Sequence, residues 1–263
     1  MKKLSILLLS LLTAMTLMAC GSKDSEAQSD MDYVKEKGTL IVGITEYPPM
    51  DYEQGEGEWI GFDADMARAF AESLDLDVEF IEIDWDNKIF ELDGKTIDCV
   101  WNGMTLVEEV VAAMECSNPY CNNSQIVIVP ADKADQYQEL ADIKDLTFAV
   151  EASSAGQGQA EANELEFTAV KSQADALLEV ASGTSDAAII DALMAGAAVG
   201  EGTDYDTLTY TVSLGSEEFG VGFRKGSELA EELNKFFAES YENGTMMELA
   251  EKYGVQASII PQE

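Results

Sequence analysis

Histidine is absent from this sequence of 263 residues, and basic residues are scarce: 15 Lys and Arg stand against 51 Asp and Glu, giving a formal net charge of −36. Without histidine there is no Ser-His-Asp triad, no Cys-His dyad and no histidine-ligated zinc or haem. A chain this acidic repels phosphate backbones, which argues against nucleic acid as a partner. Hydrophobic residues make up 46% of the chain, as in ordinary folded proteins, so the acidic bias does not indicate disorder.

The long hydrophobic run of the sequence lies at its N-terminus. Two lysines open the chain, residues 4–18 are mostly apolar but too few for a comfortable membrane span, and Cys20 follows small residues. This pattern resembles a bacterial lipobox and predicts a signal peptide over 1–19, cleaved before a lipidated Cys20. An ordinary secretory signal with a chance cysteine is the alternative. The polar residues within 20–32 are predicted to tether the protein to the outer face of the cytoplasmic membrane.

Cysteine is scarce too, with three residues beyond Cys20. Cys116 and Cys121 are five residues apart in a predicted loop, and outside the cell they could form a disulfide, which the sequence leaves open. Cys99 lies in a predicted buried strand, where cysteine packs as a small hydrophobic residue. Three cysteines without histidine do not make a convincing metal site, so we expect no metal and no cofactor.

Predicted strands and helices alternate along the chain. Residues 39–44 are apolar and β-branched, which predicts a buried strand, and a helix is expected from about Gly61, with Asp63 as its N-cap. The alternation restarts near residue 145, which predicts an α/β fold with two lobes, each a mostly parallel sheet flanked by helices. Such sheets bind ligands at the carboxyl ends of their strands. We therefore expect the binding site at the turns that follow Ile44, Trp101, Val150 and Ile190.

Short motifs follow one another in a distinctive order. They are GTLIVG at 38–43, YPP at 47–49, GFDAD at 61–65, DW at 84–85, GMT at 103–105, SNPY at 117–120, DAAIID at 186–191, GVGFRKG at 220–226 and ENGT at 242–245. Each motif alone is weak. Their order and spacing together resemble the extracellular solute-binding proteins of bacterial ABC importers, specifically the family that captures polar amino acids. The resemblance covers about 38–253.

The resemblance implies a periplasmic-binding-protein-like fold whose two lobes close over a small polar solute. Lobe one would comprise 33–122 and 220–263, and lobe two 123–219. Two hinge crossings would lie near 120–124 and 217–220. The resemblance further implies a monomeric receptor that delivers an amino acid or related amine to a membrane permease and catalyses no reaction.

Two other functions occur on the same fold. An enzyme of the dehydratase type would use Glu151 and Asp191 as acid and base. A ligand-sensing domain would normally continue into a transmembrane helix and a signalling domain, and we expect neither after Glu263. Ligand binding without product formation would exclude the enzyme, and genes for a permease and an ATPase beside this one would favour the importer over the sensor.

The family's ligand contacts transfer to this sequence position by position. On lobe one, the resemblance implies that two aromatic side chains sandwich the ligand and that polar groups in a Gly-x-Thr turn face it. On lobe two, free N–H groups at a helix N-terminus would receive a carboxylate, and an acid would bind an α-ammonium. These residues are Tyr47, Trp85, Asn102, Gly103 and Thr105 on lobe one, and Ser153, Ser154, Ala155 and Asp191 on lobe two.

One departure from the family bears on the ligand. Where the family usually has an arginine that binds the ligand carboxylate, this sequence has Val110. Glu151 stands at another contact position, and Glu46 is a further candidate acid. Three explanations are open: the ligand is cationic or lacks a free carboxylate, a remote lysine reaches into the site, or serines and backbone N–H groups suffice. We favour a ligand with positive character.

Structural roles compete with these assignments. Tyr47 could pack on the adjacent prolines, Trp85 could belong to the core, and Asp191 could cap a helix. Trp101 and Met50 are expected in the core rather than in the cleft. We expect Asp65, like Asp63, to cap a helix.

Overall fold

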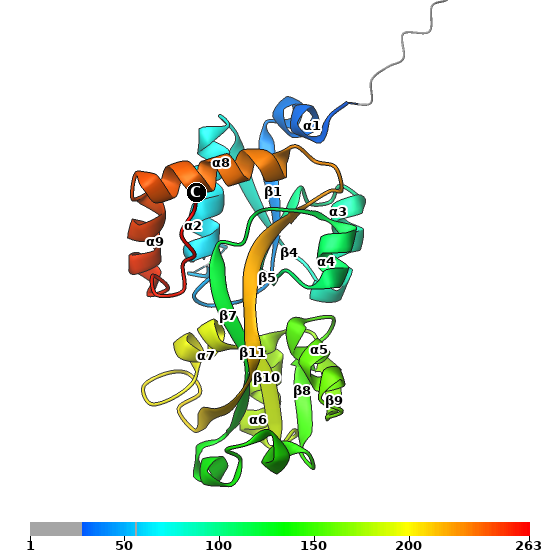
Figure 1. The fold of residues 1–263 in the computed structure, drawn as a ribbon, viewed down its shortest axis with the longest axis vertical. Coiled ribbons are helices and arrows are strands. Elements are labelled where there is room, and N and C mark those ends of the chain that lie inside the picture. The colour runs from blue at the N-terminus through cyan, green and yellow to red at the C-terminus, as the bar shows by residue number, and fades with distance from the viewer. Residues whose placement is uncertain (1–27, 56) are drawn as a thin grey trace, which may run out of the picture.

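The computed structural model describes residues 28–55 and 57–263, and its centre is one mixed sheet of nine strands (Figure 1). The strand order is β4-β1-β5-β11-β7-β10-β8-β9, with β6 (Glu115–Cys116) pairing with β11. The signal peptide, Cys20 and most of the predicted tether lie outside the described residues. Within 28–55 and 57–263, no helix combines the length and hydropathy needed to cross a bilayer.

Lobe one occupies one end of the sheet. Strand β1 (Thr39–Ile44) forms parallel pairs with β4 (Asp77–Glu82) and β5 (Cys99–Thr105). A small antiparallel pair, β2 (Tyr52–Glu53) and β3 (Trp59–Ile60), lies beside it. The helices of this lobe are α1 (Asp30–Lys37), α2 (Phe62–Ser73), the 3₁₀ turn η1 (Trp85–Asn87), α3 (Lys88–Asp93), α4 (Glu108–Ala113), α8 (Leu229–Glu242) and α9 (Thr245–Tyr253).

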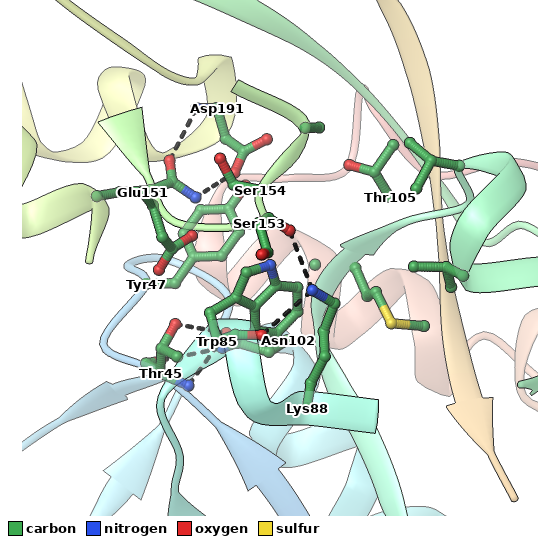
Figure 2. Close-up of a pocket in the computed structure, with 16 residues that line it drawn as sticks. Thr45, Tyr47, Trp85, Lys88, Asn102, Thr105, Glu151, Ser153, Ser154 and Asp191 are labelled. Carbon is green, nitrogen blue, oxygen red and sulfur yellow. Dashed lines mark hydrogen bonds between the residues drawn. The ribbon is translucent and has the colours of Figure 1, made fainter. Parts of the chain in front are cut away.

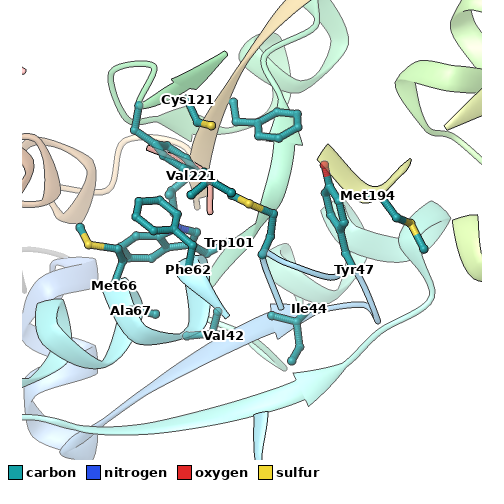
Figure 3. Close-up of a cluster of buried hydrophobic side chains, with 14 of the residues drawn as sticks. Val42, Ile44, Tyr47, Phe62, Met66, Ala67, Trp101, Cys121, Met194 and Val221 are labelled. Atoms are coloured by element: carbon teal, nitrogen blue, oxygen red, sulfur yellow. The ribbon is translucent and has the colours of Figure 1, made fainter. Parts of the chain in front are cut away.

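The lobe-one core forms around Trp101 (Figure 3). Its indole ring meets the ring of Phe70 at 6.2 Å and that of Phe237 at 5.7 Å, measured between centroids. Trp101 and Met50 are both fully buried, so the prediction that they belong to the core is confirmed. Their burial fixes the strand and the turn from which the neighbouring cleft residues project.

Lobe two occupies the other end of the sheet. Strand β8 (Thr147–Glu151) forms parallel pairs with β9 (Glu166–Val170) and with β10 (Ala187–Asp191). No sequence pattern predicts β9, a short and mostly exposed strand at the sheet edge. The helices of this lobe are α5 (Ala155–Ala162), α6 (Gln173–Ser182) and α7 (Ala192–Ala198), with the 3₁₀ helices η2 (Ala131–Gln136) and η3 (Leu140–Ile143).

Two long antiparallel strands, β7 (Cys121–Pro130) and β11 (Leu208–Phe223), run through both lobes (Figure 1). They pair with each other from the Phe219–Cys121 end to the Leu208–Pro130 end. The α/β fold is therefore as predicted, but the two expected sheets are hydrogen-bonded into one. The predicted crossings at 120–124 and 217–220 fall where these strands pair between the lobes.

The chain enters the fold earlier than the predicted tether allows. Helix α1 begins at Asp30, and the Ser29 side chain caps it by accepting a hydrogen bond from the Asp32 N–H. The Asp30 carboxylate accepts hydrogen bonds from Arg224 Nε at 2.6 Å and from Ser227 Oγ at 2.7 Å. Residues 30–32 thus belong to lobe one rather than to a flexible linker.

The predicted caps of α2 are wrong. Gly61 holds the N-cap position, and Asp63 lies inside the helix, fully buried. Asp63 accepts hydrogen bonds from the Gly103 N–H and the Tyr120 hydroxyl, both at 2.7 Å. Asp65 makes ionic and hydrogen-bond contacts with Lys252 and Tyr253 of α9. Both acids bind distant segments, which the local sequence pattern cannot reveal.

The three cysteines that the structure describes are free thiols. Cys116 pairs with Gly222 on β11, and Cys121 pairs with Phe219 on the same strand. Three residues of strand span about 10 Å, well beyond the separation of about 4.4–6.8 Å that a disulfide requires between Cα atoms. The possible disulfide is therefore not formed, because both residues are fixed in the sheet.

Candidate functional site

The predicted site residues converge on one cavity between the lobes (Figure 2). It lies at the carboxyl ends of β1, β5, β8 and β10, the four strand ends that the sequence singles out. The predicted residues that line it are Tyr47, Trp85, Asn102, Gly103, Thr105, Glu151, Ser153, Ser154, Ala155 and Asp191. Thr45, Lys88, Met104, Val107, Val110 and Gln173 line it as well. The fold brings all ten together, and their part in ligand binding stays a prediction.

Two aromatic side chains form a wall of the cavity. Tyr47 is only 2% exposed, and its ring meets Phe219 edge-on with centroids 6.3 Å apart. Among the described residues, nothing hydrogen-bonds the Tyr47 hydroxyl. A buried hydroxyl without a partner is costly, so this group is available to a ligand. Trp85 is also buried and belongs both to the cavity wall and to a lobe-one core cluster.

The polar groups of the Gly-x-Thr turn are mostly engaged within lobe one. Asn102 binds Thr45 and Asp51 through four hydrogen bonds of 2.7–3.1 Å. The Gly103 N–H donates to Asp63 at 2.7 Å. The Asn102 side chain and the Gly103 N–H are therefore not free for a ligand, although both residues line the cavity and a contact through other backbone groups of the turn stays a prediction. They hold the turn in place and leave Thr105 as its accessible polar side chain.

The N-terminus of α5 offers fewer free donors than expected. Ser153 has a positive φ of 56°, its N–H donates to Gln157 Oε1 at 2.9 Å, and Ser154 Oγ caps the helix at the Gln157 N–H. The Ser154 N–H donates to the Glu151 carbonyl at 3.3 Å. Within the described chain, the Ala155 N–H has no partner. Of the three predicted donors, it is the one left for an anion.

Asp191 is positioned by three amide side chains. Its Oδ1 accepts hydrogen bonds from Asn123 Nδ2 and, at 2.6 Å, from Gln125 Nε2. Gln173 Nε2 donates to its Oδ2. A carboxylate has about four acceptor positions, so one remains for a ligand. Burial, with Glu217 nearby, raises the pKa of Asp191 well above its usual value. Asp191 makes no side-chain cap to α7, so capping does not explain it.

Glu151 is a second buried acid in the cavity, 3% exposed at the end of β8. Burial raises its pKa to about 8, although nearby Lys88 opposes the shift. The third candidate acid, Glu46, lies outside this cavity and accepts a hydrogen bond from the Glu53 N–H at 3.1 Å. The suggestion that Glu46 belongs to the site is therefore wrong.

Lys88 is the lysine that reaches into the cavity, one of the three possibilities that the sequence leaves open without indicating which lysine it is. It is the only Lys or Arg among the described residues lining the cavity, and it is 6% exposed. Its Nζ lies 4.7 Å from the centroid of the Trp85 ring. The spacing in the sequence could have indicated this lysine, because Lys88 follows Trp85 by three residues in a short helix and so lies on the same helix face as Trp85. Val110, where the family usually has arginine, also faces the cavity.

The cavity is almost closed. Its volume of about 30 Å³ is far below the roughly 300–1,000 Å³ of ligand pockets, so the lobes or the lining side chains must move to admit a solute.

A groove of about 1,130 Å³ adjoins the cavity and shares Thr105, Val107 and residues 153–155 with it. Five acids line this groove, which gives the approach to the cavity a negative potential. They are Glu108, Glu109, Glu161, Glu217 and Glu218.

Gly103→Ala is expected to destabilise the protein and distort the cavity. Gly103 has a φ of 54°, and an added Cβ would lie 2.5 Å from Tyr47 Cε1. The strained backbone and the forced ring displacement together should lower the free energy of unfolding by about 2–4 kcal/mol in chemical denaturation. The control is Gly158→Ala in α5, where a Cβ meets nothing within 4 Å. Equal stability of the two variants would contradict this role of Gly103.

Fold and cavity together define a two-lobed α/β protein with a small cavity between its strand ends. The family model of bacterial extracellular solute-binding proteins, family 3, matches residues 40–256, so the chain belongs to that family. It is 29% identical over 260 residues to the arginine-binding extracellular protein ArtP of Bacillus subtilis, covering 96% of this chain and 98% of that protein.

Solved structures show the same similarity. An ABC uptake transporter substrate-binding protein of Streptococcus pneumoniae with bound histidine has a TM-score of 0.79 and 28% identity, covering 88% of this chain and 98% of that one. An ancestral amino acid-binding protein described as a precursor of cyclohexadienyl dehydratase has a TM-score of 0.78 and 29% identity, covering 86% and 99%. These similarities place the protein among extracytoplasmic amino acid-binding proteins associated with ABC transporters.

Proposed function

We propose that this protein is a lipid-anchored receptor, held outside the cytoplasmic membrane through Cys20, that captures a small cationic solute in its interlobe cavity. The solute is an amino acid or a related amine. The receptor acts as a monomer, delivers the solute to the permease subunits of an ABC importer, and has no catalytic step or cofactor. Lobe closure about β7 and β11 would bury the solute.

The observation that carries this proposal is the composition of the cavity. Two buried acids, Glu151 and Asp191, face it together with the aromatic side chains of Tyr47 and Trp85. Buried carboxylates are costly without a cationic partner, and an aromatic face attracts cations. Lys88 is the sole cation offered by the described lining residues, which leaves the cavity with an excess of acids. The acidic groove beside it favours cations as well.

A thermal-shift screen of the purified protein against amino acids and amines tests this function. A cationic amino acid at 100 times its dissociation constant should add about 2.7 kcal/mol of stability. Acidic amino acids should give no shift, because a negative side chain would meet Glu151 and Asp191. Mass spectrometry of the incubated ligand should show no product. Acidic amino acids binding more tightly than cationic ones, or turnover of the ligand, would contradict the proposal.

A further inference from the structure

We propose that Lys88 binds a carboxylate group of the ligand, and that the ligand is therefore an amino acid rather than an amine without a carboxylate. This inference rests on the proposed function, because it concerns the same cavity. It also explains how the site can dispense with the arginine that Val110 replaces. Lys88 reaches the cavity from α3, whereas Val110 belongs to α4.

The environment of Lys88 leaves its charge without a counterion. Its Nζ donates hydrogen bonds to the carbonyl oxygens of Trp85 at 3.2 Å and Ser153 at 3.0 Å (Figure 2). An ammonium group has three N–H donors, so one remains, and nothing in residues 28–55 or 57–263 accepts it. Glu151 and Asp191 line the same cavity, yet neither forms an ion pair with Lys88. A buried cation in this state favours an anionic partner.

Lys88 lies beside a free backbone donor at the N-terminus of α5. The Ser153 carbonyl that binds Lys88 directly precedes Ser154 and Ala155, whose N–H is unpaired. A carboxylate can therefore place one oxygen on Lys88 Nζ and the other on the Ala155 N–H. The positive end of the α5 dipole adds to this attraction. Because Lys88 belongs to lobe one and Ala155 to lobe two, the carboxylate would also hold the lobes closed.

The remaining groups of the cavity then match an α-amino acid. Asp191, with one acceptor position left, would bind the α-ammonium group. Glu151, together with Tyr47 and Trp85, would surround the side chain, and the unpaired Tyr47 hydroxyl offers a further hydrogen bond. Two acids and one lysine complement a ligand with two positive groups and one negative group. An amine without a carboxylate would leave Lys88 unpaired.

The test compares amino acids with their decarboxylated forms by isothermal titration calorimetry. The pairs are arginine with agmatine and lysine with cadaverine. Each is titrated into the wild type, Lys88→Met and Lys88→Arg. Lys235→Met, which removes an exposed lysine on α8, is the control. The wild type should prefer each amino acid. Lys88→Met should weaken amino acid binding about 10- to 100-fold, the effect of one charge-assisted hydrogen bond, and leave amine binding unchanged or tighter. Lys88→Arg should recover part of the preference, and Lys235→Met should match the wild type.

Several outcomes would overturn the role of Lys88. The first is that the wild type binds an amino acid and its decarboxylated amine with equal affinity. The second is that Lys88→Met weakens binding of the amino acid and of the amine equally. The third is that Lys88→Met prefers the amino acid over the amine as strongly as the wild type does. If the wild type binds no amino acid or amine at all, the proposed function itself fails. Thermal unfolding of the ligand-free variants checks folding, and Lys88→Gln replaces Lys88→Met if the latter does not fold.

Discussion

Asp191→Asn is expected to weaken binding of a cationic amino acid by at least about 30-fold, because truncating one partner of a buried charge pair costs roughly 2 kcal/mol or more. The substitution keeps the shape of the side chain and removes the charge that would neutralise the α-ammonium group. The substitution also replaces one carboxylate oxygen with an NH₂ group. An NH₂ group cannot accept the hydrogen bonds that Asn123, Gln125 and Gln173 donate to Asp191. Calorimetric titration measures the loss.

Glu217→Gln is the matched control for Asp191→Asn. Glu217 accepts hydrogen bonds from the same amides, Asn123 and Gln125, but lies outside the closed cavity. Its negative charge helps to raise the pKa of Asp191, but Glu217 is also one of the five acids of the groove, so removing it should change affinity far less than Asp191→Asn does. Affinity of Asp191→Asn within threefold of the wild type, or equal losses in both variants, would remove Asp191 from the binding site.

Affinity for a cationic amino acid is expected to rise with pH below about 8, by about tenfold per pH unit for each buried acid that must lose a proton on binding. Burial raises the pKa of Glu151 to about 8, so this acid is protonated in the empty site at neutral pH. A cationic ligand side chain favours the ionised form, and binding must then release a proton below this pKa. Titrations in buffers of different ionisation enthalpy measure that release directly.

The same shift predicts how the ligand-free protein responds to pH. The folded state binds the Glu151 proton more tightly than the unfolded state, so protonation of Glu151 stabilises the folded protein. This contribution to the free energy of unfolding is fully present below the unfolded pKa near 4.5 and is lost as pH rises through about 8. Cationic ligand should reverse the loss. Glu151→Gln should flatten the pH dependence of both affinity and stability. Affinity that is independent of pH, or that falls as pH rises, would contradict ionisation of Glu151 on binding.

Local sequence patterns predicted much of the fold. The apolar strand β1, the helix that starts near Gly61 and the alternation of strands and helices are all present, because short-range periodicity specifies them. The weakly patterned edge strand β9 was missed. The cap at Asp63 was predicted wrongly, and the Cys116–Cys121 disulfide was left open by the sequence, because both depend on contacts between segments that are distant in the chain.

The sequence by itself determined the class of protein, the four strand ends around the cavity, and the two acids and two aromatic residues that line it. These follow from local chemistry and from motif order along the chain. Only the tertiary structure decided which polar groups are free: Asn102 and Gly103 are engaged within lobe one, whereas Lys88 and the Ala155 N–H face the cavity. The reason is physical. A buried polar group is available to a ligand only if no distant segment satisfies it, and distant segments meet only in the folded chain.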